Sequence, residues 1–527
     1  MAENSHTVPW WQNGIIYQVY PRSFQDTNGD GIGDLNGILS RLDHFVHLGI
    51  DAIWIAPIYP SPMADFGYDV ADHCAVDPIF GTLADFDRLV AAAQARGLRI
   101  ILDFVPNHTS DRHPWFTESR VSRDSTKRDW YIWRDPGPDG GPPNNWLSEF
   151  GGPAWTFHPA TGQYYYHAYL PQQPDLNWRN VDVRAAMLDV LRFWFERGVA
   201  GFRVDAIHHL FEDEQLRDNP SNPDWHDWMS PARRVLRTHT MDQPEVHAAI
   251  AEMRKVADAY GDRLMIGEAY LPFDRLMAYY GVDLTGFQLP FNFELIHTPW
   301  QPTAVAALVA AYEAALPQGA WPNWVLGNHD RARVASRLGP EQARVAAMLL
   351  LTLRGTPTIY QGEELGMENV PIPLDRVQDP WERNVPGFGR DPVRTPMPWT
   401  AEPGGGFTSG HPWLPLGADL ATANAAAQEV DPRSMLALYR ALLRLRRAEP
   451  ALAIGKFFPV AATEEVFAYE RRHGERRLLV VLNMSGERSE ICVDEAVILL
   501  STHLDREKEA VSRRLFLRPN EGCVAQL

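Results

Sequence analysis

Eight short runs rich in Ile, Val and Tyr alternate with longer amphipathic stretches between residues 15 and 361, and this alternation most constrains the fold. It is typical of parallel strands joined by helices. The runs are residues 15–20, 52–57, 99–105, 199–205, 263–268, 286–291, 324–327 and 357–361. Between the first two, apolar residues at helical spacing over 35–45 and the following Gly49 predict a helix with a glycine stop. Eight strand–helix units predict an α/β fold, the (β/α)₈ TIM barrel, with an active site at the carboxyl ends of its strands.

Two stretches depart from the alternation and divide the chain. Residues 107–178 are rich in Pro, Gly, Asp and Trp and are too long for a loop between a strand and a helix. They predict a small inserted domain over the barrel mouth, between two barrel parts at 1–106 and 179–454. From 455 to 527, short β runs separated by polar turns predict a C-terminal antiparallel β domain.

Charge and composition narrow the function. The 527 residues carry a net charge of −18, which repels nucleic acid and anionic lipid and favours neutral or cationic small molecules. The first fourteen residues lack a basic start and an apolar segment, and no apolar run approaches the roughly 18 residues of a membrane span. Three cysteines without metal-ligand spacing argue against a disulfide framework. We expect a cytoplasmic protein that binds neither nucleic acid nor membrane.

Acidic side chains stand at the predicted carboxyl ends of three strands. In GFRVDA, Arg203 and Asp205 face the same side, and the guanidinium is expected to lower the pKa of Asp205 and keep it ionised as a nucleophile. Glu268 ends the fifth run, where partly apolar surroundings can raise its pKa and make it a proton donor. His329 and Asp330 follow the seventh run. Two carboxylates flanking a bond suit either retaining or inverting hydrolysis of a glycoside, and spacing alone leaves both open.

Several motifs together identify a family. They are DFVPNH (103–108), QPDLN (173–177), GFRVDA (201–206), GEAY (267–270), GNHD (327–330) and RTPMPW (394–399), with the opening WWQNGIIYQVYPRSFQD. The whole chain resembles the α-amylase family, glycoside hydrolase family 13, in its α-glucosidase and oligo-1,6-glucosidase branch. The resemblance implies that Asp205 is the nucleophile that forms a covalent glucosyl-enzyme, Glu268 the general acid and base, and Asp330 a stabiliser of the transition state, with retention of configuration.

The resemblance also implies a blind pocket for a terminal glucose. The binding residues carried over are Asp65 and Arg394 at the non-reducing-end hydroxyls, Tyr68 as a stacking platform, His108, Arg203 and His329 around the glucose, and the pocket aromatics Phe150 and Tyr169. Tyr169 stands where the branch usually has Phe. In this branch, Ala directly after the nucleophile, as at Ala206, accompanies α-1,4 rather than α-1,6 preference, and α-1,3 and α-1,2 linkages stay open as alternatives.

A loop after the first run resembles the start of a calcium loop. Asp26, Asn28, Asp30 and Asp34 place hard oxygens at alternating positions around glycines, but the bidentate Glu of an EF-hand is missing. A Gly, Asn and Asp turn without metal remains an alternative. The resemblance implies a structural Ca²⁺ or Mg²⁺ here, with the carbonyl of Ile32 as a further ligand, and we expect no organic cofactor.

The resemblance therefore implies an exo-acting, retaining α-glucosidase that acts on maltose-like α-glucosides and transfers glucose to sugar acceptors, and we expect a monomer or homodimer. Within the enzymes, the alternatives are a sucrose or trehalose isomerase, which reseals the glucosyl unit, and an oligo-1,6-glucosidase. Outside them, the alternative is a catalytically dead binding subunit of the same fold. Such a subunit is typically membrane-anchored and has a broken set of catalytic acids, and the sequence shows neither feature.

Overall fold

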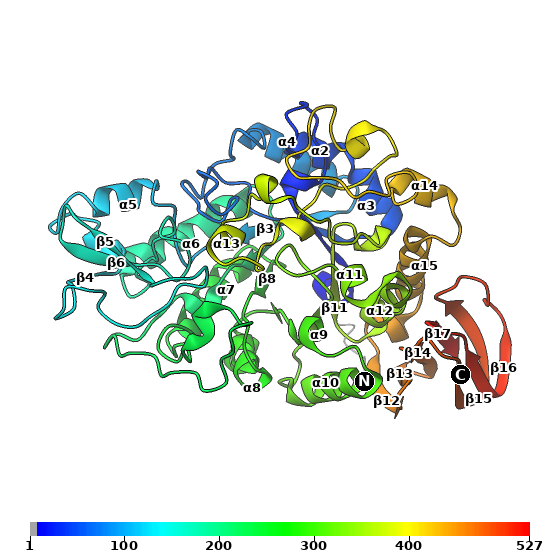
Figure 1. The fold of residues 1–527 in the computed structure, drawn as a ribbon. Coiled ribbons are helices and arrows are strands. Elements are labelled where there is room, and N and C mark those ends of the chain that lie inside the picture. The colour runs from blue at the N-terminus through cyan, green and yellow to red at the C-terminus, as the bar shows by residue number, and fades with distance from the viewer. Residues whose placement is uncertain (1–7) are drawn as a thin grey trace.

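A computed structural model describes residues 8–527, and its central element is an eight-stranded parallel barrel (Figure 1). The strands are β1 (Ile16–Val19), β2 (Ala52–Ile55), β3 (Arg99–Phe104), β7 (Gly201–Val204), β8 (Leu264–Gly267), β9 (Leu289–Pro290), β10 (Asn323–Val325) and β11 (Thr356–Tyr360). They pair in the order β10-β11-β1-β2-β3-β7-β8-β9. A parallel bridge between Asn292 and Trp324 joins the two ends of this sheet. Each of the eight predicted runs overlaps one of these strands, and the predicted barrel is confirmed.

Helices pack around the barrel because each buries one apolar face against the strands (Figure 1). The main ones are α2 (Leu35–Ser40), α3 (Leu42–Leu48), α4 (Leu83–Gln94), α6 (Val181–Glu196), α7 (Val246–Asp258), α10 (Pro302–Ala315), α12 (Pro340–Thr352) and α15 (Met435–Ala448). The helix predicted over 35–45 is two helices, because Arg41 between them leaves the helical conformation (φ −106°, ψ 11°). The predicted stop is present: Gly49 ends α3 at φ 93°, a left-handed conformation that glycine adopts without strain.

Residues 107–178 hold a small sheet at one side of the barrel, cyan in Figure 1. Its strands β4 (Trp133–Arg134), β5 (Trp155–His158) and β6 (Gln163–Tyr166) are antiparallel in the order β4-β6-β5, and α5 (Pro114–Ser119) precedes them. Trp146, Trp155 and Tyr166 form the centre of a separate apolar cluster there. This segment therefore has a core of its own beside the barrel.

The C-terminal residues form a six-stranded antiparallel sheet, orange to red in Figure 1. The strands are β12 (Lys456–Ala462), β13 (Val466–His473), β14 (Arg476–Asn483), β15 (Ser489–Ser501), β16 (Ala510–Leu517) and β17 (Gly522–Gln526). The buried guanidinium of Arg471 donates hydrogen bonds to the carbonyls of Thr352 and Gly455, and the hydroxyls of Thr352 and Tyr469 lie 2.6 Å apart. These bonds fasten the sheet to α12.

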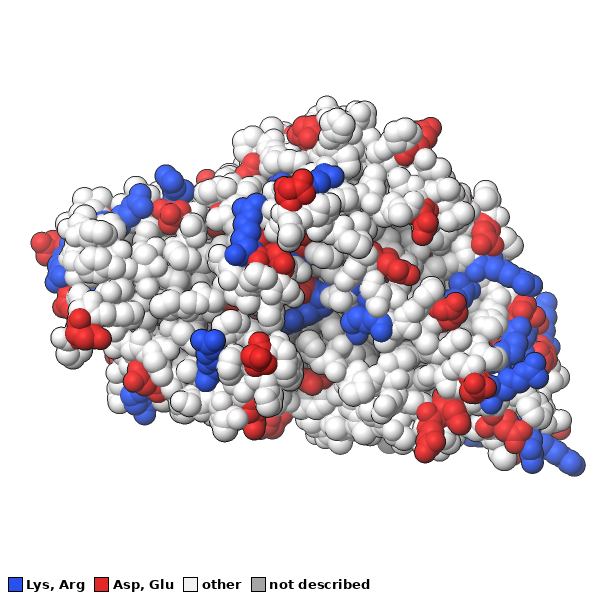
Figure 2. Space-filling model, in the orientation of Figure 1, with Lys and Arg blue, Asp and Glu red and all other residues white. Residues whose placement is uncertain are grey.

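Charged side chains are scattered over the face seen in Figure 2, where acidic and basic groups are interspersed among uncharged ones. This face of the described chain has no broad basic surface of the kind that binds nucleic acid. None of the helices in the described residues has both the length and the apolar character that a bilayer crossing requires.

Candidate active site

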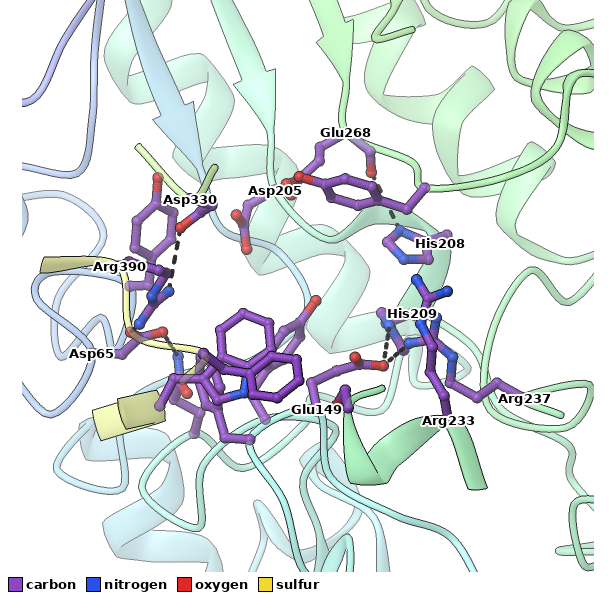
Figure 3. Close-up of a pocket in the computed structure, with 18 of the residues that line it drawn as sticks. Asp65, Glu149, Asp205, His208, His209, Arg233, Arg237, Glu268, Asp330 and Arg390 are labelled. Atoms are coloured by element: carbon purple, nitrogen blue, oxygen red, sulfur yellow. Dashed lines mark hydrogen bonds and ion pairs between the residues drawn. The ribbon is translucent and has the colours of Figure 1, made fainter. Parts of the chain in front are cut away.

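A cavity of about 300 Å³ lies at the carboxyl ends of the barrel strands (Figure 3). Eight of the eleven residues predicted for catalysis or substrate binding line it: Asp65, Tyr68, His108, Phe150, Tyr169, Asp205, Glu268 and Asp330. The other three, Arg203, His329 and Arg394, are fully buried behind this lining and contact it. The cavity volume is at the lower end of the range for small-molecule sites, about 300–1,000 Å³.

The backbone of the barrel fixes the positions of two acids. Asp205 directly follows β7, and its N–H donates a hydrogen bond of 2.8 Å to the carbonyl of Phe104 in β3. Glu268 directly follows β8, and its N–H donates a bond of 3.0 Å to the carbonyl of Val204. Asp205 and Glu268 each directly follow one of two adjacent strands, so both side chains point into the same space at the carboxyl ends of these strands.

A single guanidinium holds three carboxylates. Nη1 of Arg203 lies 2.6 Å from Oδ1 of Asp205 and 2.5 Å from Oδ1 of Asp103, and Nη2 lies 2.8 Å from Oε2 of Glu268. Arg203 is 1% exposed, so these contacts are screened little by water. Asp205 and Glu268 thus flank one guanidinium group, which holds the two carboxylates close together.

Ala206 connects the same two acids through the backbone. Its φ of 46° is left-handed, a conformation that costs a non-glycine residue energy and that is enriched at functional sites. The N–H of Ala206 donates a hydrogen bond of 2.9 Å to Oε2 of Glu268. Glu268 therefore lies against Arg203 and this amide rather than in the partly apolar surroundings that we expected.

The expected direction of the Asp205 pKa is wrong. Burial raises the pKa of Asp205 well above its ordinary value, and the neighbouring carboxylates of Glu268, Asp103 and Asp330 raise it further. Arg203 lowers the pKa, as predicted, but it is shared among three carboxylates and cannot offset both effects. Burial likewise raises the pKa of Asp103 to about 6. Asp205, Asp103 and Glu268 thus share one cation, and the mutual repulsion of these carboxylates adds to the effect of burial on the pKa of Asp205.

Asp330 lies among arginines, whereas Asp205 lies among carboxylates. Its Oδ1 lies 2.8 Å from Nη2 of Arg394 and 3.4 Å from Nη1 of Arg390, and its Oδ2 lies 3.2 Å from Nε2 of His329. Burial raises the pKa of Asp330, but the positive charges around it outweigh burial and hold the pKa well below its ordinary value. The pKa values of Asp330 and Asp205 are therefore shifted in opposite directions, and Asp330 is ionised at neutral pH.

The arginine expected beside Asp65 is not Arg394. Nη2 of Arg390 lies 2.6 Å from Oδ1 of Asp65 and 2.7 Å from Oδ1 of Asp379, and Arg390 lines the cavity. Arg394 is 0% exposed, and its Nε donates a hydrogen bond to the carbonyl of His329. The prediction of Arg394 at the cavity is corrected to Arg390, four residues earlier in GRDPVR. Arg390 lies just before the RTPMPW motif and Arg394 opens it, and only the path of the backbone decides which of them reaches Asp65.

His329 supports Tyr68 instead of lining the cavity. The two rings stack in parallel, with centroids 5.4 Å apart and an angle of 2° between their planes. The hydroxyl of Tyr68 lies 2.7 Å from Nε2 of His329, and Nδ1 lies 2.7 Å from Nε2 of Gln18. His108 does line the cavity, and burial lowers its pKa to about 3, so it is neutral at physiological pH.

Aromatic side chains form one wall. Phe150 meets Tyr169 and Trp381 edge to face, with ring centroids 5.9 and 5.2 Å apart. Phe150 and Tyr169 come from the small-sheet segment, whereas Trp381 belongs to α13 (Pro380–Asn384), after the last barrel strand. No sequence signal singled out Trp381, because an isolated Trp in a loop has no periodicity and no motif.

The side of the cavity opposite Asp65 and Arg390 carries charged residues that were not predicted from the sequence. Figure 3 shows Glu149, His209, Arg233 and Arg237 together, across the cavity from Asp65 and Arg390. Glu149 forms an ion pair with Arg237, and its Oε1 lies 3.7 Å from Nε2 of His209. Glu149 belongs to the small-sheet segment (107–178) and the arginines to the long connection after β7, so the ion pair of Glu149 and Arg237 joins two separate segments.

The predicted metal loop is closed by its own hydrogen bonds. Asp26 accepts bonds from the N–H groups of Asn28, Gly29 and Gly31, and Asp34 accepts one from Gly37 at the start of α2. Asn28, Asp30 and Ile32 lie between them, and the N–H of Ile32 donates a bond of 2.8 Å to Oδ1 of Asp30. No group of three or more His, Cys, Asp or Glu side chains within residues 8–527 has metal-binding geometry. The cation stays a prediction.

Comparison with known proteins gives consistent results. A sequence model of the α-amylase catalytic domain matches residues 18–455. A probable α-glucosidase of Rhizobium meliloti (strain 1021) is 45% identical over 496 residues, which cover 91% of this chain and 90% of that protein. Among solved structures, the α-glucosyl transfer enzyme XgtA is 41% identical with a TM-score of 0.93, covering 99% of this chain and 100% of that one. An isomaltulose synthase of Erwinia rhapontici NX5 is 34% identical with a TM-score of 0.90, covering 99% of each chain.

Proposed function

The chain belongs to the α-amylase family of glycoside hydrolases, and we propose that it is a retaining, exo-acting α-glucosidase that releases the terminal glucose of short α-glucosides. The observation that carries the retaining mechanism is the guanidinium of Arg203, which holds Asp205 and Glu268 on neighbouring nitrogens. Retaining glycosidases need their two carboxyl groups about 5–5.5 Å apart, whereas inverting ones leave about 6.5–9.5 Å for a water molecule. Two carboxylates on one guanidinium suit the shorter separation.

In the first step, the free oxygen of Asp205 attacks C1 of the glucose while Glu268 donates its proton to the glycosidic oxygen. The bond between C1 and that oxygen breaks, the aglycone leaves as an alcohol, and an ester joins C1 to Asp205. Oε2 of Glu268 is occupied by Arg203 and the Ala206 N–H, so Oε1 is the oxygen that carries the proton. Asp330, held ionised by arginines, stabilises the positive charge that develops on the sugar ring.

In the second step, the ionised Glu268 takes a proton from water, whose oxygen attacks C1. The ester bond breaks, Asp205 leaves as a carboxylate, and the glucose is released in the α configuration. When the hydroxyl of a second sugar takes the place of water, the same step forms a new glucoside. XgtA, by its name a glucosyl transfer enzyme, supports this transfer reaction for the present chain.

A network of buried charges supports exo action. Asp65 and Arg390 are 3% and 6% exposed and line the cavity on the side away from Arg233 in Figure 3, and the fully buried Asp379 pairs with Arg390. A sugar seated there can present hydroxyls to Asp65 and Arg390, but a longer chain cannot extend past them. Their charge-assisted bonds are the strong, directional kind that fix a sugar in one orientation.

A panel of disaccharides tests the proposed activity. Because of Ala206, we expect maltose to be hydrolysed with a kcat/KM several-fold above that for isomaltose, and α-glucose to be the first product. Sucrose distinguishes the main alternative, since an isomerase converts it to another disaccharide whereas a glucosidase releases glucose and fructose. A rearranged disaccharide as the main product, or no turnover of any α-glucoside, contradicts the proposal. Asp205, Glu268 and Asp330, the three predicted catalytic acids, all line the cavity, which opposes the catalytically dead alternative.

For the loop at Asp26–Asp34, we propose a structural Ca²⁺ or Mg²⁺ held by Asp26, Asn28, Asp30, Asp34 and the carbonyl of Ile32. Oxygen donors suit both cations, and the three carboxylates of the loop form no ion pair within the described residues, which supports this proposal. Removing the ion with EDTA should lower the Tm by several degrees, and CaCl₂ or MgCl₂ should restore it. An unchanged Tm together with the absence of metal in the purified protein contradicts the site.

A further inference from the structure

The cavity lining contains more arginines than form ion pairs with its carboxylates. Each carboxylate of the lining has an arginine partner. Arg390 pairs with Asp65 and Asp330, and Arg394 also pairs with Asp330. Arg203 pairs with Asp205 and Glu268, and Arg237 pairs with Glu149. Two further arginines, Arg233 and Arg331, line the same cavity. Neither forms an ion pair with any carboxylate of residues 8–527, and Nε of Arg331 is buried without a hydrogen-bond partner.

Arg331 stands next to the catalytic acids on the leaving-group side. Its guanidinium carbon lies 4.9 Å from the ring centre of Tyr270, which follows Glu268 by two residues. Glu268 protonates the departing group, so the aglycone passes beside Tyr270 and Arg331. Contact with an aromatic ring fixes the plane of a guanidinium, and the nearby Tyr270, Asp330 and Glu268 raise the pKa of Arg331, so it keeps its positive charge at the cavity.

Arg233 belongs to the same positive region. It lies in η4 (Pro231–Arg234), on the side of the cavity opposite Asp65 and Arg390 in Figure 3. Burial and the charge of Arg331 lower the pKa of Arg233, and burial together with Arg331 and Arg233 lowers the pKa of the nearby His297 to about 4. Two unpaired guanidiniums thus face one part of the cavity, in a protein whose net charge is −18.

We propose that the leaving-group end of the cavity selects α-glucosides whose aglycone carries an anionic oxygen group, a carboxylate or a phosphate, through Arg331 and Arg233. Guanidinium binds both groups in a bidentate manner. The inference rests on the proposed glucosidase function and defines its substrate class. It also differs from the expectation drawn from the net charge, because local cations outweigh a distant negative field once salt screens it over about 8–10 Å.

Matched substrates test the proposal on the full chain. We would measure kcat/KM for α-glucosylglycerate against α-glucosylglycerol, and for trehalose 6-phosphate against trehalose. A charge-assisted hydrogen bond contributes about tenfold or more in affinity, so at least one anionic member should be preferred by about 10-fold or more. The two pairs distinguish carboxylate from phosphate. The preference should decline in 0.5 M NaCl, since salt screens exposed charges.

Variants locate the effect. Arg331→Gln and Arg233→Gln should each reduce the anionic-to-neutral ratio of kcat/KM several-fold, and the double variant should bring it close to one. The matched control is Arg234→Gln, which removes the same charge from the same short helix but from a side chain that stacks on Trp225 outside the cavity. It should leave the ratio unchanged.

Three outcomes would overturn the inference: no preference for either anion, a preference that the double variant keeps, or one that Arg234→Gln also removes. In each case, hydrolysis of maltose or trehalose would show that the glucosidase function itself stands. Failure to hydrolyse any neutral or anionic α-glucoside would instead refute the proposed function.

Discussion

Replacing Asp205 by Asn is expected to reduce kcat for p-nitrophenyl α-glucoside by more than about 10,000-fold, because the amide cannot form the ester with C1. The fold should survive this change. Burial and three neighbouring carboxylates raise the pKa of Asp205, so its ionisation at neutral pH opposes folding, and the neutral Asn removes that cost. The Tm of the variant should equal or exceed that of the parent enzyme. Initial rates and thermal unfolding, measured on the same preparation, check both statements.

The matched control for this substitution is Asp494→Asn, an exposed aspartate in the C-terminal sheet. It should leave both kcat and Tm unchanged. An Asp205→Asn enzyme that retains more than about a tenth of the parent activity would remove Asp205 from the reaction. A variant that is inactive because it is unfolded would show in its Tm, and Asp205→Glu would then separate loss of structure from a displaced nucleophile.

Replacing Glu268 by Gln is expected to lower kcat for maltose by about 100- to 10,000-fold, the usual contribution of a general acid or base. The loss should depend on the leaving group. A 2,4-dinitrophenyl aglycone leaves without protonation, so formation of the glucosyl-enzyme should be affected far less than with maltose. The second step should then limit turnover, since no base activates water. Burst kinetics with the dinitrophenyl glucoside measure this directly.

Azide provides the decisive control for Glu268. It needs no general base, so it should restore turnover of the Glu268→Gln enzyme with the dinitrophenyl glucoside and yield α-glucosyl azide. Glu507→Gln, an exposed substitution between β15 and β16, should respond to neither the leaving group nor azide. Equal losses for both substrates, or a β-glucosyl azide product, would mean that Glu268 has a different role.

The barrel could be predicted from the sequence because its signals are local. Parallel strands buried on both faces appear as short apolar runs, and helices appear as amphipathic stretches. The bend at Arg41 was missed, since apolar spacing continues through it. The positions of Asp205 and Glu268 could also be predicted, because the residue that directly follows a barrel strand points into the mouth.

The remainder of the site depends on contacts between distant segments. The pKa of Asp205 depends on how many carboxylates share Arg203, and Asp103 and Glu268 come from other strands. The partner of Asp65 is decided by the path of the chain around Arg390. The unpaired state of Arg331 follows only once every other ion pair in the cavity is known. Sequence spacing contains none of this information.

The retaining mechanism requires a covalent bond between Asp205 and glucose, and trapping that intermediate tests the mechanism most directly. Incubation with 5-fluoro-α-D-glucosyl fluoride should slow the second step and leave the enzyme heavier by one fluoroglucosyl group. Peptide mass spectrometry should locate the group on Asp205. An enzyme that turns the reagent over without any adduct and releases β-glucose first from maltose, or an adduct on any other residue, would contradict the mechanism.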